Sequence, residues 1–184
     1  AGDCSLRAAI QEANTSPGSV IHVPAGLYVL SLAGTGEDAS ATGDLDILAT
    51  MSITGAGADV TTVNANLTDR IFEVHATAPG TQIEGLTIED GFASRCGGVL
   101  NGASLTLFQV HIVDNSSVGG GGGVCHDTTL PLDILESTIS GNASQDNGGG
   151  VALVSNAQLR VINSTISGNS AATRGLDGIV VANT

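Results

Sequence analysis

A regular spacing of apolar residues constrains the fold of this chain most strongly. Valine or isoleucine follows a glycine at steps of 25, 27 and 28 residues, in the column Val99, Val124, Val151 and Ile179. The same stride, followed backward, reaches Phe72 and Ile47. A second apolar column keeps this stride through Val63, Ile88, Ile112, Ile139 and Ile166. Such columns are typical of a solenoid, in which each repeat is a structural unit stacked on the last.

Within each repeat the apolar residues alternate with polar ones. Leu105 and Leu107 flank Thr106, and Leu132 and Ile134 repeat the pattern one unit later. A period of two, with Gly, Asn, Asp and Ser between the runs, indicates short strands and tight turns. We therefore predict an all-β fold, a single-stranded parallel β-helix. It forms one domain over residues 1–184, with about six to seven coils from 19 to 184. We expect both apolar columns to point into the tube.

The composition supports a narrow tube. Glycine accounts for 26 of the 184 residues, aromatic residues make up 2%, and tryptophan is absent. Small and β-branched side chains fit the interior of such a tube, whereas large rings do not. The length is sufficient for one domain with a substantial core.

A third column is polar and consists of Asn66, Gly91, Asn115, Asn142 and Asn169. Asparagine at a fixed turn position can stack its amide on that of the next coil and form a hydrogen-bonded ladder. Asparagine also tolerates the left-handed backbone of a sharp bend, and glycine makes that bend without a side chain. We predict a structural role for these asparagines.

The N-terminal segment is expected to be the one helix, over residues 4–14. Asp3 or Ser5 can cap it, and one face is apolar while the other is polar. The apolar face carries Leu6, Ile10 and Ala13, and Arg7, Gln11 and Glu12 point away from it. We expect this helix to cover the open end of the tube. No comparable element follows Ile179, so we predict an uncapped C-terminal coil, which either continues into a longer repeat array or associates head-to-tail with another copy.

Residues 4–14, CSLRAAIQEAN, closely resemble the "CSLREAI…AN" cap of secreted bacterial right-handed parallel β-helix proteins. The runs GGGVC at 121–125 and GGGVA at 148–152, with ISGN at 139–142 and 166–169, resemble the repeats of polymorphic outer-membrane protein (Pmp-like) passengers. Ile139 and Ile166 stand where those repeats usually carry phenylalanine. The resemblance implies a right-handed tube and an extracellular protein, often an adhesin or surface-layer component.

The chain is strongly acidic, with 18 acidic and 5 basic residues and a formal net charge of −13. All five basic residues are arginines. Such a surface repels nucleic acid and anionic lipid, so we expect neither as a partner. No apolar run reaches the length of a membrane helix, and we expect no membrane insertion. An acidic, lysine-free chain rich in Ser, Thr and Asn suits an extracellular or cell-surface location. The chain starts without a signal peptide, as expected of a mature secreted chain.

Three cysteines do not form an even disulfide framework. The apolar columns place Cys96 level with Gly121, and Cys125 level with Leu100. Neither thiol then lies over the other, so we predict that Cys96 and Cys125 are not bridged. With Cys4 in the cap, free and partly buried thiols are the first interpretation, and an intermolecular disulfide is the alternative.

The acidic residues cluster in the stretch 37–46. Asp44 and Asp46 are weak candidates for a metal site, because the stretch lacks the spacing of a calcium-binding loop. We predict a solvated insertion there. Catalytic β-helices that act on acidic polysaccharides gather carboxylates and a basic residue on one outer face. We find no such group on consecutive coils and predict no catalytic residue and no cofactor.

Two function classes follow. The first is a non-enzymatic extracellular structural or adhesive protein, whose partners are further copies of itself or cell-surface glycans. The second is a carbohydrate-active β-helix, lyase- or hydrolase-like, or a carbohydrate-binding remnant of one. Repeats of this kind report the geometry of the tube and say little about activity.

Overall fold

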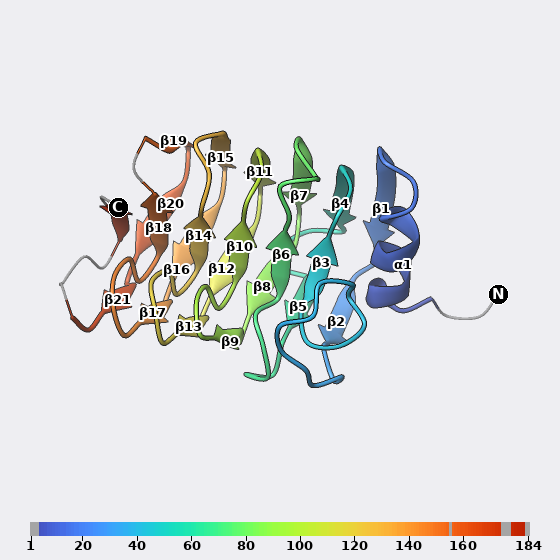
Figure 1. Ribbon diagram of the computed structural model, residues 1–184, viewed down its shortest axis with the longest axis horizontal. Coiled ribbons are helices and arrows are strands. Elements are labelled where there is room, and N and C mark those ends of the chain that lie inside the picture. Colours follow the sequence, from blue (N-terminus) through green and yellow to red (C-terminus); the bar gives the residue numbers. More distant parts are fainter. Residues whose placement is uncertain (1–3, 155, 174–177, 183–184) are drawn as a thin grey trace.

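The computed structural model describes residues 4–154, 156–173 and 178–182. It confirms an all-β parallel solenoid with one short helix at its N-terminal end, and this helix and the strand Ile179–Ala182 lie at opposite ends of the rod (Figure 1). Every strand pairing within the described residues is parallel and joins one coil to the next.

Three sheets run along the rod, each with six strands in the described residues. The first sheet contains β1 (Ser19–Val23), β4 (Met51–Gly55), β7 (Thr81–Glu84), β11 (Leu105–Phe108), β15 (Pro131–Leu135) and β19 (Gln158–Ile162). The second contains β2 (Gly26–Val29), β5 (Thr61–Asn64), β8 (Thr87–Glu89), β12 (His111–Val113), β16 (Thr138–Ser140) and β20 (Thr165–Ser167). The third contains β3 (Leu45–Ile47), β6 (Phe72–Val74), β10 (Val99–Asn101), β14 (Val124–His126), β18 (Val151–Val154) and β22 (Ile179–Ala182).

A fourth sheet of four short strands forms only from the third coil onward. It contains β9 (Phe92–Ala93), β13 (Ser116–Ser117), β17 (Ala143–Ser144) and β21 (Ser170–Ala171). In the first two coils the chain passes from the second sheet to the third without such a strand. The first of these connections, residues 30–44, is long and is called the β2–β3 loop below.

Helix α1 (Leu6–Ala13) lies against β1 and β3 at the N-terminal end (Figure 1). The Ser5 hydroxyl accepts a hydrogen bond from the Ala8 backbone N–H at 3.2 Å and caps the helix. Leu6, Ile10 and Ala13 are buried as predicted. Their packing on the first coil closes this end of the tube, where the interior would otherwise be open to water.

The two apolar columns follow the predicted stacking with one correction and two exceptions, and the first exception is Ile166 of the second column, which is only partly buried. Val99, Val124 and Val151 pair in register and are fully buried, and so are Val63, Ile88, Ile112 and Ile139 of the second column. Leu45, not Ile47, pairs with Phe72, and Ile47 pairs with Val74. The prediction slipped by two residues, which keeps Ile47 pointing inward and fully buried. Ile179 pairs with Val151 but is 41% exposed, because it lies in the last described coil.

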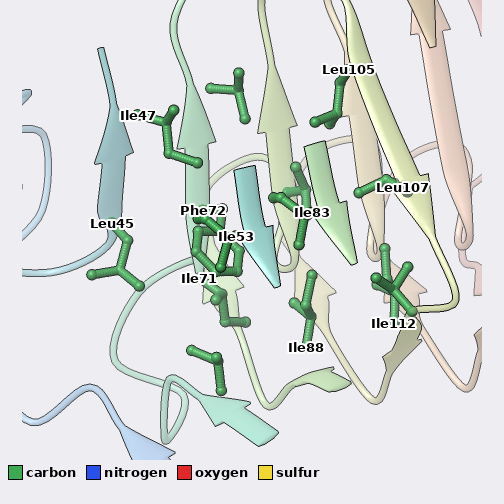
Figure 2. Close-up of a cluster of buried hydrophobic side chains, with 14 of the residues drawn as sticks. Leu45, Ile47, Ile53, Ile71, Phe72, Ile83, Ile88, Leu105, Leu107 and Ile112 are labelled. Atoms are coloured by element: carbon green, nitrogen blue, oxygen red, sulfur yellow. The ribbon is translucent and has the colours of Figure 1, made fainter. Parts of the chain in front are cut away.

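The buried apolar side chains form one continuous cluster along the tube. Figure 2 shows Leu45, Phe72, Ile83, Ile88 and Ile112 gathered between the sheets. Each inward side chain is covered by its counterparts in the coils above and below. The core is therefore a stack of layers of nearly constant composition.

The asparagine ladder forms at three of the four predicted asparagines. The Asn115 amide donates to Asn142 Oδ1 at 3.0 Å, and the Asn142 amide donates to Asn169 Oδ1 at 2.9 Å. Asn115 Oδ1 in turn accepts from the Gly91 backbone N–H at 2.9 Å, so the ladder ends at Gly91. All three asparagines are buried.

Asn66 does not join this ladder and is exposed, so the prediction is wrong there. The ladder occupies the corner between the second and fourth sheets, and the coil of Asn66 has no strand in the fourth sheet. The left-handed backbone is present at Asn66 itself, as predicted, but the prediction misplaced it in the ladder coils. In the ladder coils it falls on the preceding residue, which is Asp90, Asp114, Gly141 or Gly168.

The close approach of the backbones of neighbouring coils explains the glycines of the GGG runs. A Cβ built on Gly122 would lie 2.5 Å from the Ala143 carbonyl oxygen, and one on Gly149 would lie 2.3 Å from that of Ser170. The backbone of one coil therefore passes too close to the next for any side chain.

The prediction of unbridged Cys96 and Cys125 is wrong, because the two residues form a disulfide with a Cα–Cα distance of 5.5 Å. Cys125 lies on the outward side of β14, and a Cβ on Gly121 would come within 2.2 Å of its sulfur. Gly121 lies level with Cys96, so its missing side chain lets the sulfur of Cys125 reach across. Cys4 is free and exposed.

We predict that Val124→Asp lowers the free energy of unfolding by on the order of 5 kcal/mol, because it places a charge inside a dry tube. The measurement is urea unfolding followed by circular dichroism. Thr138→Asp, at an outward position of β16, is the matched control and should change stability by about 1 kcal/mol or less. Equal losses in both variants would contradict the inward stacking.

We also predict that Asn142→Ala costs about 2–4 kcal/mol, because its amide donates to the Ile112 and Ser140 carbonyls as well as to Asn169. Asn66→Ala, outside the ladder, should cost about 1 kcal/mol or less, the strain of its left-handed backbone. The two melting curves compare the positions directly. A loss at Asn66 as large as that at Asn142 would show that the ladder contributes nothing.

Candidate functional site

Asp44 and Asp46 are buried rather than part of a solvated insertion, so that prediction is wrong. Asp44 precedes β3 and is 2% exposed, and Asp46 at the centre of β3 is fully buried. Asp46 points to the outer side of the third sheet, where the β2–β3 loop folds over it. Its Oδ2 accepts a hydrogen bond from the Ser40 backbone N–H of that loop at 2.7 Å.

The next coil brings more charged residues to the same place. Glu73 pairs in register with Asp46, and Arg70 and His75 lie on either side of Glu73 in sequence. The Arg70 guanidinium contacts the Asp44 carboxylate through Nε and Glu73 Oε2 through Nη2 at 3.2 Å. His75 Nε2 lies 3.0 Å from Asp46 Oδ1. We call Asp44, Asp46, Asp69 and Glu73, with Arg70 and His75, the acidic cluster.

Helix α1 and the β2–β3 loop hold the cluster closed. The Arg7 guanidinium donates to the carbonyls of Ser40, Thr42, Gly43 and Asp44. The Gln11 amide donates to the Ser40 carbonyl at 2.8 Å. These two side chains were expected only to face away from the apolar side of the helix, and they fasten the loop to it. Figure 1 shows this loop running beside β3, close to the helix.

Asn14 completes the fastening at the other end of the helix. Its side-chain amide donates to the Asp46 carbonyl, and its Oδ1 accepts from the Leu48 backbone N–H, both at 2.8 Å. The Ser40 hydroxyl also bonds both backbone groups of Asp46. The conformation of β3, and with it the position of the Asp46 carboxylate, is thus set by Asn14 after the helix and by Ser40 of the β2–β3 loop.

Three carboxylates of the cluster, those of Asp44, Asp69 and Glu73, are harder to ionise than free carboxylates. Burial raises the pKa of Asp44 to about 7; the negative charges of Asp69 and Asp46 add to the rise, and Arg70 opposes it. Burial also raises the pKa of Asp69 and that of Glu73. The positive charge of Arg70 opposes the rise at all three carboxyl groups but does not cancel it.

Two groups of side chains within the described residues have the spacing of metal ligands. Carboxylate oxygens of Asp44, Asp46 and Glu73 lie within 4.8 Å of one another. Ligand atoms of Asp38, Asp46 and His75 do so as well, with Asp38 exposed. The first group offers oxygen atoms alone, which suits a hard cation.

A second polar feature lies inside the tube rather than on its surface. Asn101 and His126 stack on consecutive coils, with the Asn101 amide donating to His126 Nδ1 at 2.7 Å. His126 Nε2 donates to the Leu130 carbonyl at 2.7 Å, so the imidazole is neutral. Burial lowers the pKa of His126. Both ring nitrogens are engaged, so His126 serves packing.

The predicted register was wrong at Asp46, and for this reason the sequence did not predict the acidic cluster. With Ile47 opposite Phe72, Asp46 lies level with Ile71, and its true neighbour Glu73 goes unnoticed. A stride of 27, the step from Val124 to Val151, would have placed Glu73 beside Asp46 on the outer face. No sequence signal shows that the β2–β3 loop covers the pair.

Comparison with family models, with curated proteins and with solved structures gives no match to this chain. In the part of the chain that the structure describes, no helix has the length and apolar character to cross a membrane.

We predict that Asp44→Asn stabilises the protein at pH 8 relative to pH 5 in buffer free of divalent cations. The raised pKa means that the folded state holds the Asp44 proton more tightly than the unfolded state. The stability that this gives is complete below about pH 4 and is lost as the pH rises through 7. Asparagine mimics the protonated form, so its advantage should grow by about 2–4 kcal/mol over this range.

Denaturant unfolding at several pH values measures this difference. Asp133→Asn is the control, since a hydrogen bond from Arg160 lowers the pKa of Asp133, and its effect should not change between pH 5 and 8. A constant difference between Asp44→Asn and the parent chain would contradict the prediction.

Proposed function

We propose that this protein is a non-enzymatic, extracellular structural or adhesive β-solenoid. The observation that most supports this proposal is that the acidic cluster is closed off from solvent. Asp44, the last residue of the β2–β3 loop, is 2% exposed, and Asp46 and Asp69 are 0% and 3% exposed. Charged side chains that are covered in this way are placed to stabilise the fold, because a substrate cannot reach them.

The disulfide supports an extracellular location. Cys96 and Cys125 join neighbouring coils, and disulfides persist in oxidising compartments. The acidic, lysine-free composition fits the same location. The likeness of residues 4–14 to the CSLREAI-type cap, and of the GGGV and ISGN runs to Pmp-like repeats, favours a bacterial cell-surface protein.

The last described coil supports end-to-end association. Ile134 is fully buried, whereas Val161, its partner in β19, is 39% exposed, and Ile179 of β22 is 41% exposed. Inward apolar positions are thus partly uncovered at this end. A second copy stacked head-to-tail would bury them, and such a contact propagates as a filament. Cell-surface glycans are the other partner that we propose.

A carbohydrate-active enzyme is the second candidate, and one observation favours it. Acids and bases do meet on consecutive coils, with Asp46 beside Glu73, Arg70 and His75. A carboxyl group whose pKa is raised to about 7, as in Asp44, is suited to general acid catalysis. This role would require the β2–β3 loop to open.

Two measurements separate the candidates. We expect no release of reducing ends and no rise in ultraviolet absorbance when the protein is incubated with neutral and uronic polysaccharides, with and without Ca²⁺. We expect light scattering to show a mass that grows with protein concentration, and Val161→Asp to abolish this growth. Turnover lost in Glu73→Gln would establish the enzyme, and a strict monomer at high concentration would refute end-to-end association.

A further inference from the structure

We propose that the free edge of β2, with the side chains of Leu27, Val29 and Leu32, is the surface that receives the last coil of a second copy. The inference rests on the end-to-end association proposed above and names the acceptor surface for it. Helix α1 lies against β1 and β3, the first strands of the first and third sheets. β2 lies below this helix in Figure 1 and pairs only with β5 among the described strands. Of the three long sheets, the second is thus the one whose edge is left open at this end.

The backbone of β2 turns unpaired hydrogen-bonding groups to this edge. The Gly26 N–H donates to the Val60 carbonyl of the next coil at 2.8 Å. Backbone groups point alternately to the two sides of a strand, so those of Leu27 and Val29 point away from β5. Natural sheets protect such edges with charged residues, prolines or bulges. The sequence of β2, GLYV, contains neither a charged residue nor a proline.

The side chains at this edge are apolar and exposed. Leu27, Val29 and Leu32 are 64%, 49% and 54% exposed. Two hollows of about 290 and 370 Å³ lie between this part of the chain and the helix, and both are lined by Leu6 of α1 and Tyr28 of β2. Exposed apolar side chains that gather in one place mark a surface that binds another protein.

The last described coil offers apolar side chains that suit this surface. Val161, Ile162 and Ile179 are 39%, 41% and 41% exposed. Val161 and Ile179 occupy inward positions, and their partners in the preceding coil, Ile134 and Val151, are fully buried. Aliphatic side chains of this size can enter the hollows beside α1, and the removal of apolar surface from water on both copies favours the contact.

The distribution of charge along the chain favours a second copy as the occupant. Two copies with a net charge of −13 repel each other, so they meet most readily where their surfaces are uncharged. Residues 13–36, which include β1 and β2, contain no acidic residue and no arginine. Residues 147–173, which include β19 and β20, contain no acidic residue, and Arg160 is their one arginine. The two ends of the rod are therefore the parts with which this acidic chain can contact itself.

The test compares two valines of equal exposure by light scattering over a range of protein concentrations. Val29 at the proposed surface is 49% exposed, and Val118, which follows β13 in the middle of the rod, is 48% exposed. Val29→Asp should raise the concentration at which the mass grows by about tenfold or more, because the contact would bury a charge. Val118→Asp is the matched control and should change that concentration by about twofold or less. All chains carry Cys4→Ser, because the free and exposed thiol of Cys4 can join two copies by a disulfide.

A mixture of two variants shows how the ends meet. Val29→Asp blocks the acceptor surface and leaves the last coil intact, whereas Val161→Asp blocks the last coil and leaves the acceptor surface intact. Each variant alone should stay monomeric at concentrations where the parent chain associates. Their equimolar mixture should form a dimer with one copy of each, because one intact pair of complementary ends remains. Circular dichroism checks that each variant is folded, and Leu27→Asp replaces Val29→Asp if the latter is not.

Four results would overturn the proposal. If Val29→Asp associates like the parent chain while Val161→Asp is monomeric, the acceptor surface is refuted and the end-to-end association stands. Equal losses in Val29→Asp and Val118→Asp would assign the effect to added charge. Dimers of Val161→Asp that disappear when Val29→Asp is added to the same chain would show that two β2 edges pair with each other. A parent chain that stays monomeric at high concentration would refute both this surface and the proposed association.

Discussion

Parallel hydrogen bonding between neighbouring coils places each residue directly over its counterpart one coil later. The registers Val99 to Val124 and Val124 to Val151 show this at a single position of the repeat. Because backbones in such pairs are roughly 4.8 Å apart, side chains at equivalent positions touch. Whatever one coil carries at a position must therefore be compatible with what the next coil carries there.

This constraint explains why the interior is so uniform. Apolar side chains stack on apolar side chains, asparagine on asparagine at the corner, and Asn101 on His126 inside the tube. Gly122 and Gly149 lie where the next backbone passes too close for a side chain. The same rule sets the limit of the ladder, since Asn66 has no strand of the fourth sheet beside it and turns to solvent.

The same stacking makes the outer face of the third sheet chemically distinctive. It places Asp46 next to Glu73, which brings like charges together, and Arg70 compensates them only in part. Further along the sheet, Cys125 reaches Cys96 of the preceding coil. The first coil covers its charges with the β2–β3 loop, and Arg7 and Gln11 of helix α1 fasten that loop. A capping helix thus does more than close the tube, because it also sets the environment of the buried carboxylates.

The sequence by itself determined the architecture, because strict repetition of Val, Ile, Asn and Gly leaves few alternatives to stacked coils. It also located helix α1 and the inward columns, since burial depends on alternation that can be read along the chain. Only the tertiary structure decided the register at Leu45 and Phe72, where the long β2–β3 loop breaks the stride. That loop buries Asp44 and Asp46 and joins them to Glu73, Arg70 and His75. The disulfide likewise forms because the sulfur of Cys125 can pass beside Gly121, which has no side chain. This is a distance in space that the spacing of residues along the sequence does not reveal.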